Sequence, residues 1–379
     1  MSHTGWKNLP FKAAVEAHGS SSAGLPQQEW TDVGRFPVIG QGAEDVEGWT
    51  NRDDLLLTPS PSVVLYGGHT RRVKHVSHPF VPGPNVKILT PISGLDSKFL
   101  YYFLRQLPIE SKGYADHFPL VRKFDVPVPP LAEQQRIVRL LDEAFKAIAI
   151  ANANAEKNIQ NARRLFESQL QSLFTQRQTR WEETVLEDVT KKITDGSHNP
   201  PSGVPVSQFL MLSSKNVFDD ALDYLNPRYL SAENFDLEHK RTGIIPGDVL
   251  LTIVGTIGRC AVVPDGAPQI TLQRSVAVIR PDQARLASRF LMYSLMSRRA
   301  ELNEQSRGVA QKGIYLESLR NFSVMVPTLE EQVRIVGTLD QLQDHTNQLA
   351  KNYTQKAKSL NRIGTTLLHQ AFSGKLAVA

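Results

Sequence analysis

The chain has 379 residues, of which 41% are hydrophobic and 21% are charged, a length and composition typical of a globular protein with two domains. No apolar run is long enough to cross a membrane, and the first residues show no basic segment followed by an apolar run, so we expect neither a membrane span nor a secretory signal. The single cysteine, Cys260, excludes a disulfide framework and a cysteine-based zinc site within one chain, and favours a reducing, cytoplasmic setting. The net charge of +5 and the pI of about 9.2 are compatible with a nucleic-acid partner.

Residues 1–128 form the first predicted globular region, which has a mixed α/β pattern. An amphipathic segment predicts a short helix at Ser97–Leu107, and an extended segment, Phe124–Pro129, leads out of the region. Short apolar runs bounded by Gly and Pro predict strands. These strands are Asp54–Thr58, Ser62–Tyr66 and Val86–Thr90.

The stretch between Asp54 and Asp96 contains no acidic residue. It carries cations and histidines beside a Gly-Gly turn at Gly67 and Gly68, an arrangement that suits a phosphate-binding surface. A solvated loop with an accidental bias in composition is the alternative. The basic residues of the stretch are His69, Arg71, Arg72, Lys74, His75, His78 and Lys87.

Residues 129–178 predict one long helix. Pro129 stands just ahead of an acidic first turn that contains Glu133, and both features are typical of a helix start. Apolar residues then recur at alternating steps of three and four, which predicts a coiled-coil seam, and a helix of roughly 40 residues would be about 60 Å long. Asn152 is polar and lies on the seam, where it either fixes the helix register or marks a solvent-facing bend. The seam comprises Val138, Leu141, Phe145, Ile148, Asn152, Ala155, Ile159, Ala162, Phe166, Gln169 and Leu173.

Residues 179–326 form the second globular region, in which a turn-rich loop, Thr194–Gly203, precedes the strands. A helix is predicted at Ala287–Ser297. Because both regions place a short helix ahead of a long one, we interpret them as diverged copies of one fold. The predicted strands are Phe209–Leu212, Val249–Val254, Cys260–Val263 and Ser275–Ile279.

The segment Val126–Val138 recurs as Val324–Val336, 198 positions on and without a gap. A repeat this long indicates a duplicated structural unit. Residues 327–379 therefore predict a second long helix, and two such helices in one chain can pack as an antiparallel coiled coil. Two unrelated amphipathic helices are the alternative. The second seam comprises Leu339, Leu342, Thr346, Leu349, Tyr353, Leu360, Ile363 and Leu367.

Two short sequences resemble enzyme motifs but lack a necessary part. Asn199–Ser202 resembles the Asn-Pro-Pro-aromatic motif of amino-methyltransferases without the aromatic residue, and Ile39–Gly42 resembles a glycine-rich cofactor loop without a following helix. A turn is the better interpretation of both. The sequence has no phosphate-binding P-loop, no Gly-x-Ser-x-Gly elbow and no His-Glu-x-x-His spacing. It therefore predicts no catalytic residue, no metal site and no cofactor in this chain.

The duplicated segment and its long helix resemble the conserved regions of the DNA-specificity subunit of type I restriction-modification systems. The resemblance extends over essentially the whole chain, because several further segments resemble parts of a target recognition domain or the usual ending of the family. These segments are Ile245–Gly258, Ile270–Ile279, Ser306–Gly313 and Gln370–Leu376.

The resemblance implies a mixed α/β fold. Residues 1–128 and 179–326 would be two target recognition domains, and residues 129–178 and 327–379 would be two spacer helices in an antiparallel coiled coil. Each domain would read one half of a split, asymmetric sequence in double-stranded DNA, and the helix length would set the gap between the halves. Methyltransferase subunits, usually two, would dock here, carry S-adenosylmethionine and methylate adenine, while a restriction subunit with motor and nuclease activity would cut unmodified DNA. The chain itself would be a non-catalytic, cytoplasmic subunit without membrane contact.

DNA-binding candidates follow from charge and from this resemblance. Arg and Gln can pair with the edges of guanine and adenine, and Lys and Arg can neutralise phosphates; each candidate could instead be an ordinary surface cation or make a local structural bond. In the first domain the candidates are His69, Arg71, Arg72, Lys74, Lys112 and Tyr114. In the second domain they are His198, Lys215, Arg274, Arg307, Gln311 and Lys312.

The polar residues that open the two long helices are the same in both copies. Helix capping explains the glutamates, but it explains the arginines less well. We therefore expect these residues to fasten each helix end either to the neighbouring domain or to a methyltransferase subunit. They are Glu133, Gln134, Arg136, Glu331, Gln332 and Arg334.

Two other functions compete with DNA recognition. A coiled-coil scaffold with protein-binding end domains is one, and a complete methyltransferase or nuclease is the other. The acid-free basic stretch and the turn-rich pair of domains favour DNA, and the missing cofactor and catalytic motifs argue against an enzyme. Salt-dependent binding to duplex DNA distinguishes a recognition subunit from a scaffold.

Overall fold

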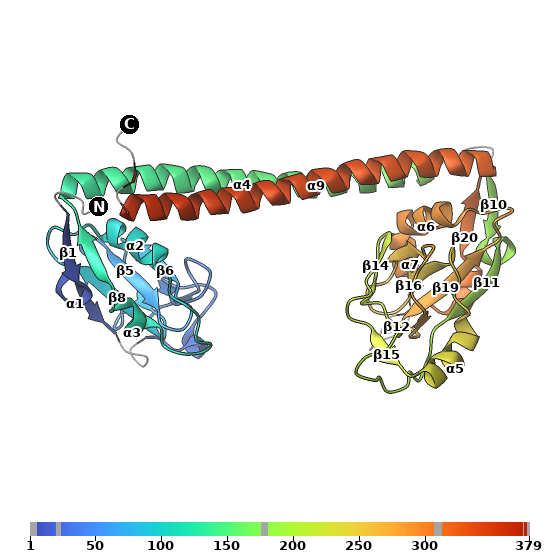
Figure 1. The fold of residues 1–379 in the computed structure, drawn as a ribbon, viewed down its shortest axis with the longest axis horizontal. Helices are drawn as coiled ribbons and strands as arrows, with labels where there is room; N and C mark the ends of the chain where they lie inside the picture. Colours follow the sequence, from blue (N-terminus) through green and yellow to red (C-terminus); the bar gives the residue numbers. More distant parts are fainter. Residues whose placement is uncertain (1–5, 20–23, 176–180, 307–312, 374, 377–379) are drawn as a thin grey trace. The chain divides into compact units, whose positions relative to one another are not determined.

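The chain divides into two compact units, unit 1 (residues 1–156 and 353–379) and unit 2 (residues 157–352). Each unit has mixed α/β structure and contains parts of both long helices (Figure 1). Because the units divide inside these helices, the domain limits given above for the sequence remain predictions. The structure is a computed structural model and describes residues 6–19, 24–175, 181–306, 313–373 and 375–376.

Unit 1 is built on a four-stranded antiparallel sheet with the order β2-β8-β5-β6. Every residue of β5 is buried, as expected for a short continuous apolar run. Helix α2 lies between this sheet and the first long helix (Figure 1), and Asp96 caps it by accepting the backbone N–H groups of Lys98 and Phe99. The elements are β2 (Val15–His18), β5 (Val63–Gly67), β6 (Val73–Val76), β8 (Val86–Pro91) and α2 (Ser97–Gln106).

Two smaller sheets complete unit 1. A three-stranded sheet has the order β4-β3-β7, with β3 and β7 parallel, and a two-stranded sheet pairs β1 with β9. The strands are β1 (Lys7–Pro10), β3 (Phe36–Ile39), β4 (Gly48–Thr50), β7 (Val81–Pro82) and β9 (Asp125–Val128). The short helices are α1 (Phe11–Ala14), η1 (Gln27–Glu29) and α3 (Phe118–Val121).

Three sheets of unit 2 have the same arrangement as those of unit 1. Its main sheet has the order β11-β19-β16-β17, its three-stranded sheet the order β15-β12-β18 with β12 and β18 parallel, and β10 pairs with β20. The strands are β10 (Glu182–Val185), β11 (Thr190–Asp195), β12 (Phe209–Leu212), β15 (Arg228–Leu230), β16 (Val249–Thr252), β17 (Cys260–Val262), β18 (Ile270–Leu272), β19 (Val276–Pro281) and β20 (Ser323–Val326). The short helices that match unit 1 are η2 (Leu186–Val189), α6 (Ser288–Ser297) and α8 (Leu316–Arg320).

The two units also share the register of their main sheets. Gly67 of β5 lies opposite Val86, the first residue of β8, and Thr252 of β16 lies opposite Val276, the first residue of β19. The interpretation of two diverged copies is thereby confirmed. Among the described residues, three elements of unit 2 have no counterpart in unit 1: the hairpin β13 (Val217–Phe218) with β14 (Ala221–Leu222), α5 (Ala232–Thr242) and α7 (Arg299–Glu304).

Helices α4 (Leu131–Thr175) and α9 (Leu329–Phe372) contain 45 and 44 residues. In unit 1 the early part of α4 packs with the late part of α9, since Leu141 shares one apolar core with Leu368 and Ala371. In the described part of the chain, no helix is both long enough and apolar enough to cross a membrane.

In unit 2 the late part of α4 packs with the early part of α9. Phe166 and Leu170 share a core with Ile335 and Leu339. Early residues of one helix therefore meet late residues of the other in both units, which confirms the antiparallel packing predicted from the repeat.

The predicted seam is correct in the first part of α4 and shifts later. Gln169 is exposed and Leu170 is buried instead, because the period of 3.6 residues in a straight helix drifts away from a strict heptad. In α9, Leu349 and Ile363 are 44% and 50% exposed, so their assignment to the seam is wrong. At Gly364 an added Cβ would lie 3.0 Å from Phe145, so this glycine provides the close approach of the helices.

Asn152 fixes the pairing of the helices in unit 1. Its Nδ2 donates to Oδ1 of Asn361 at 2.9 Å, across from α4 to α9. Of the two interpretations of Asn152, helix register is therefore the one that the hydrogen bond supports.

The strand predicted at Asp54–Thr58 is wrong. This segment forms a turn, and only Leu57 makes an isolated bridge, with Phe80. Pro59 and Pro61 follow it and have no backbone N–H to extend a ladder. Leu55 and Leu56 pack instead against a small apolar cluster, so their hydrophobicity reflects core packing rather than a strand.

Candidate nucleic-acid interface

Loops from distant parts of the sequence meet at one end of unit 1. The backbone N–H of Gly68, in the β5–β6 turn, donates to the carbonyl of Asn85 at 3.0 Å, and that of His117 donates to the carbonyl of Gly68 at 2.8 Å. Leu25 donates to the carbonyl of Pro82 at 2.8 Å. This end of the unit therefore joins the β5–β6 turn to the segments before β8 and before α3.

Buried His117 fixes the segment that carries two of the DNA-binding candidates. Its Nε2 accepts the backbone N–H of Lys112 at 2.9 Å, so Nδ1 carries the proton and donates to the carbonyl of Gly68 at 3.0 Å. Tyr114 stacks on His69, with ring centroids 4.4 Å apart and planes within 6°. Tyr114 is 85% exposed, and an exposed aromatic face beside cations can stack on a nucleic-acid base.

The cations of the β5–β6 turn have different environments. Arg71 adopts a positive φ of 61°, and its Nη1 donates to the carbonyl of Ile109 at 2.7 Å, while Arg72 is exposed on the same turn. Lys74 instead pairs with Glu47 at 2.6 Å, and its side chain is only 10% exposed. The structure thus groups Arg71 and Arg72 with the aromatic pair, whereas Lys74 is the weakest of the DNA-binding candidates.

Unit 2 builds the same end from the same kind of loops. Ser197 donates its backbone N–H to the carbonyl of Leu272 at 2.8 Å, and Arg274 donates to the carbonyl of Ser197 at 2.9 Å. Ile253 donates to the carbonyl of Ser275 at 2.9 Å. The segments after β11, β16 and β18 therefore lie together.

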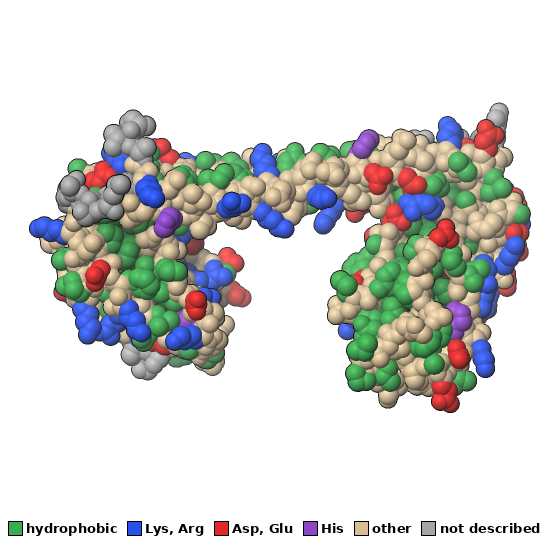
Figure 2. All heavy atoms as spheres, in the orientation of Figure 1, with side chains coloured by type: hydrophobic (Ala, Val, Ile, Leu, Met, Phe, Trp, Pro, Cys, Tyr) green, Lys and Arg blue, Asp and Glu red, His purple; other side chains and the backbone are tan. Residues whose placement is uncertain are grey.

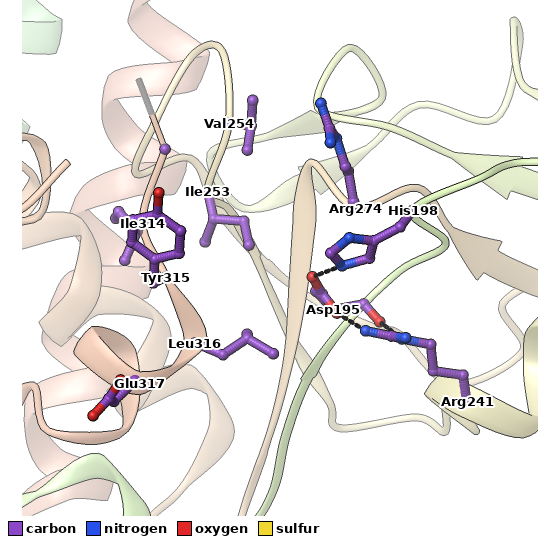
Figure 3. Close-up of a pocket in the computed structure, with 11 residues that line it drawn as sticks. Asp195, His198, Arg241, Ile253, Val254, Arg274, Ile314, Tyr315, Leu316 and Glu317 are labelled. Carbon is purple, nitrogen blue, oxygen red and sulfur yellow. Dashed lines mark hydrogen bonds and ion pairs between the residues drawn. The ribbon is translucent and has the colours of Figure 1, made fainter. Parts of the chain in front are cut away.

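A buried carboxylate orients His198 in unit 2 (Figure 3). The Nε2 atom of His198 donates to Asp195 at 2.7 Å, and Arg241 of α5 donates to the other oxygen of the same carboxylate. The Asp195 side chain is 8% exposed and that of His198 is 54% exposed, so a fixed pair presents an open imidazole. Arg274 extends from the neighbouring loop on the same side (Figure 3).

The remaining candidates of unit 2 lie in two other loops. Lys215 is exposed in the turn that follows β12. Arg307, Gln311 and Lys312 lie outside the described residues. The structure therefore groups His198 with Arg274, and the other four candidates remain predictions from the sequence.

A hollow of about 530 Å³ lies beside this loop end of unit 2. It is bounded by Asp195 at the end of β11 and by Leu316 at the start of α8. Its lining includes His198, Arg241 and Arg274 together with the carboxylates of Asp195 and Glu317, so the hollow presents both cationic and anionic groups.

A matching hollow of about 580 Å³ in unit 1 lies between the end of β2 and the start of α3. The sequence did not indicate it, because its basic residues are far apart in the chain and the fold alone gathers them. Lys and Arg side chains collect along the lower edge of unit 1 in Figure 2. The charged and histidine residues of the hollow are Lys12, Glu16, His18, Lys87, Asp116 and Arg122.

Arg259 is a further candidate that the sequence did not single out. Gly67 donates its backbone N–H to the carbonyl of Arg72 at 2.8 Å, and Thr252 donates to the carbonyl of Arg259 at 2.9 Å, so the two arginines hold matching places. The guanidinium of Arg259 lies 4.9 Å from the centre of the Phe218 ring. The turn is longer in unit 2, which hides the correspondence in the sequence.

The charged residues that open the long helices pair within their own helix. Arg136 donates from Nε to Glu133 at 2.7 Å, and this hydrogen bond holds the pKa of the Glu133 carboxyl below its usual range. Arg334 lies 3.5 Å from Glu331 and its side chain is 75% exposed. Contact with a partner subunit stays a prediction for these four residues.

Gln134 and Gln332 are fully buried, unlike the other residues of this set. Both bond to backbone groups of their own unit. Of the two alternatives for fastening a helix end, the neighbouring domain is therefore the one that these two side chains contact in the structure.

The described residues contain no group of three or more His, Cys, Asp or Glu side chains that could hold a metal ion. Cys260 is buried, and burial raises the pKa of its thiol well above the usual value. A neutral, buried thiol is a poor nucleophile.

A family model for the type I restriction modification DNA specificity domain matches residues 20–161 and 212–359, which is most of the chain. The chain belongs to this family. The resemblance noted from the sequence is confirmed, and membership among specificity subunits agrees with the expectation that the chain is not itself an enzyme.

Two specificity subunits of Escherichia coli are similar to this family member along much of its length. The type I restriction enzyme EcoBI specificity subunit is 27% identical over 278 residues, which cover 66% of this chain and 58% of the relative. The EcoR124I/EcoR124II specificity subunit is 24% identical over 350 residues, which cover 86% of this chain and 83% of the relative. The chain thus spans little more than half the length of the first of these.

Solved structures with the same fold match this chain along nearly its whole length. One solved structure, described as the structural basis of complex assembly and conformational transition of the type I restriction-modification system, has a TM-score of 0.72 at 19% identity. The match covers 98% of this chain and 98% of that chain. The HsdS subunit of Thermoanaerobacter tengcongensis has a TM-score of 0.55 at 20% identity, covering 99% of this chain and 98% of that one. At these identities the likeness shows the fold, which is two α/β units with two long helices.

Proposed function

We propose that this chain selects the DNA sequence for a type I restriction-modification complex. Residues 1–128 and 179–326 act as two target recognition domains, and each reads one half of a bipartite, asymmetric target in double-stranded DNA. The paired helices set the unread gap between the halves. The chain contributes recognition, and the chemistry belongs to its partners.

One observation carries this proposal. The same topology is built twice in one chain, and the matching loop ends display different polar side chains. Unit 1 presents Arg71 and Tyr114, whereas unit 2 presents His198 and Arg274. Two copies of one scaffold with different loops suit the reading of two different sequences, because base edges are distinguished by the side chains that reach them.

Membership of the family supports the partners that we propose. Methyltransferase subunits, two in number, dock on the helices and the domains and bind S-adenosylmethionine. A restriction subunit joins them to cut unmodified DNA. The helix-opening charges Glu133, Arg136, Glu331 and Arg334 are the residues that we assign to these contacts, because they lie at the surface where the long helices begin.

A map of methylated adenine in the source cells, with and without this gene, tests the proposal. We expect one split motif, two short blocks around a fixed gap, to lose its methylation on deletion and to regain it when the wild-type gene is restored. Restoring a gene with the double change Arg71→Ala and Tyr114→Ala should relax or abolish reading of one block while the other block is unchanged.

If deletion of the gene changes no methylated motif, copurification decides between two explanations. If no split motif changes, a methyltransferase that copurifies with the tagged chain would show an inactive partner rather than a different role. If no motif changes and no methyltransferase copurifies, the proposed function is wrong. Salt-independent binding to protein partners alone would favour the scaffold alternative.

A further inference from the structure

Each long helix begins by bonding into the short helix of its own unit. In unit 1, Oε1 of Gln134 accepts the backbone N–H of Asp96, the N-cap of α2, at 2.7 Å. Its Nε2 donates to the carbonyls of Gly94 at 2.8 Å and Pro129 at 2.7 Å. One buried amide thus satisfies three backbone groups and joins α4 to the start of α2.

Unit 2 repeats this contact atom for atom. Oε1 of Gln332 accepts the backbone N–H of Ala287, the N-cap of α6, at 2.8 Å. Its Nε2 donates to the carbonyls of Arg285 at 2.8 Å and Pro327 at 2.9 Å. An internal amide with all its bonds satisfied is a stiff joint, because breaking any of them leaves a buried polar group unpaired.

A second contact lies two helical turns further along. In unit 1, Asp142 of α4 accepts from the hydroxyl of Tyr102 at 2.6 Å and from Nζ of Lys98 at 2.7 Å, both on α2. Burial and this hydrogen bond raise the pKa of Tyr102, which keeps its hydroxyl protonated as a donor. The side chains of Lys98 and Asp142 are 38% and 36% exposed, so this ion pair is partly screened by water.

The matching contact of unit 2 has an additional support. Asp340 of α9 accepts from the hydroxyl of Tyr293 at 2.6 Å and from Nη2 of Arg289 at 2.6 Å, both on α6. Arg289 also donates to both oxygens of Asp220, at 2.9 and 3.0 Å, in the β13–β14 hairpin, which has no counterpart among the described residues of unit 1. A guanidinium fixed from two sides is better preorganised than the flexible ammonium of Lys98.

We call these paired contacts bracket 1 and bracket 2. Bracket 1 joins Gln134 and Asp142 to α2, and bracket 2 joins Gln332 and Asp340 to α6. The two contact points of each bracket are about 12 Å apart along the helix axis. Two separated points resist tilting, whereas a single point would let the domain pivot.

We infer that the brackets are specificity-determining positioning elements, which fix the angle of each target recognition domain on its long helix and so restrict the DNA gap that the chain accepts. This inference rests on the proposed function. One base pair more or less moves the second half-site by about 3.4 Å and turns it by roughly a tenth of a helical turn. A domain that cannot pivot cannot follow such a displacement.

The difference between the brackets predicts which of them, when weakened, lets the chain accept a changed DNA gap. Removing the tyrosine hydroxyl leaves Asp340 with Arg289, which Asp220 still holds. The same change in unit 1 leaves Asp142 with Lys98 alone. Bracket 1 is therefore the weaker joint, and loosening it should relax gap selection more than the matching change in bracket 2.

The test measures binding of the full chain to duplexes that carry both half-sites, taken from the methylation map, at the native gap and at one base pair more or less. A duplex with a single half-site is included. The variants are Asp142→Ala, Tyr102→Phe and Tyr293→Phe, and the matched control is Tyr101→Phe, because the hydroxyl of Tyr101 contacts Arg105 outside the bracket. Tyr102→Phe keeps the ring that stacks on Phe145 and so retains the packing even if Asp142→Ala folds poorly.

We expect the wild-type chain and Tyr101→Phe to prefer the native gap by at least about tenfold, since losing even one specific base pair costs on the order of tenfold in affinity. Asp142→Ala should reduce this preference to within about threefold, Tyr102→Phe by a smaller factor and Tyr293→Phe least, with half-site affinity unchanged. An unchanged gap preference in the bracket 1 variants overturns the inference, as does a loss confined to half-site affinity. A wild-type chain without any gap preference overturns the proposed function itself, and the inference with it.

Discussion

The two units share a scaffold and differ in the residues at its loop end. In unit 1 a short turn after Gly67 exposes Arg71, and Tyr114 stacks on His69 of the same turn. In unit 2 the matching turn after Thr252 is longer and carries Arg259, and His198 adds a polar group from the loop after β11. The sheets set where the loops emerge, and the loops are free to vary because they carry little of the core. One fold can thus provide two different reading surfaces.

The units also differ in how firmly they hold the long helices, although both use a buried glutamine. Replacing Gln134 or Gln332 by Ala should have the largest effect, a loss of about 2–4 kcal/mol in the free energy of unfolding, because each change leaves three backbone groups unpaired. Denaturant unfolding of the full chain measures this loss. Equal losses would show that the two glutamines are equivalent.

The neighbouring Gln135 provides the control for this comparison. It is exposed, so Gln135→Ala should change the free energy of unfolding by less than about 0.5 kcal/mol. A similarly small effect of Gln134→Ala would contradict the role that we assign to its three hydrogen bonds.

A smaller effect should distinguish the cores of the two units. Tyr66 precedes Gly67 in β5, and Leu251 precedes Thr252 at the matching place in β16. Both are buried, but the hydroxyl of Tyr66 has no hydrogen-bond partner among the described residues. Tyr66→Phe should therefore raise the free energy of unfolding by about 1 kcal/mol at neutral pH, as measured by denaturant unfolding.

The same residue should give unit 1 an alkaline sensitivity. Burial raises the pKa of Tyr66 from its ordinary value of 10.0 to about 12. The folded state therefore holds this proton more tightly, and the associated stability is complete below pH 10 and is lost as the pH rises to about 12. Tyr66→Phe should lack this part of the alkaline loss, and an identical pH profile in both chains would contradict the assignment.

The smallest effect concerns the matched arginines of the two turns. Arg72→Gln and Arg259→Gln should each reduce the slope of log affinity against log salt by about 1, if both turns contact phosphates. Titration of the target duplex at several salt concentrations measures the slope. A change in only one variant would show that the two units use different loops to contact the DNA backbone. No change in either variant would show that neither arginine contacts DNA phosphates.

Much of the fold was predictable because it depends on local pattern. The strand Phe209–Leu212 and the helix from Ser97 were found from apolar runs and amphipathic spacing. The strand predicted at Asp54–Thr58 was wrong, because its leucines pack against a neighbouring cluster without joining a ladder. An apolar run indicates that its side chains are buried, but it does not show which backbone groups form hydrogen bonds.

The candidate site was predictable only in part. The basic turn of unit 1 was visible as an acid-free stretch, and the structure groups Arg71 and Arg72 there with Tyr114. Lys74 stood in the same stretch, yet its ammonium is neutralised by Glu47, which precedes the stretch. Charge along a sequence therefore indicates a basic surface without showing which cations a neighbouring carboxylate has already paired.

By itself, the sequence determined the duplication, the two long helices and the family, because these depend on repeats and periodicity along the chain. Only the tertiary structure decided which polar residues are buried joints. Gln134 and Gln332 resemble other polar residues at a helix start, and their role depends on backbone groups more than 30 positions away. Such contacts exist only once α2 and α6 have packed beneath the long helices, since a hydrogen bond depends on the position of both its partners in space.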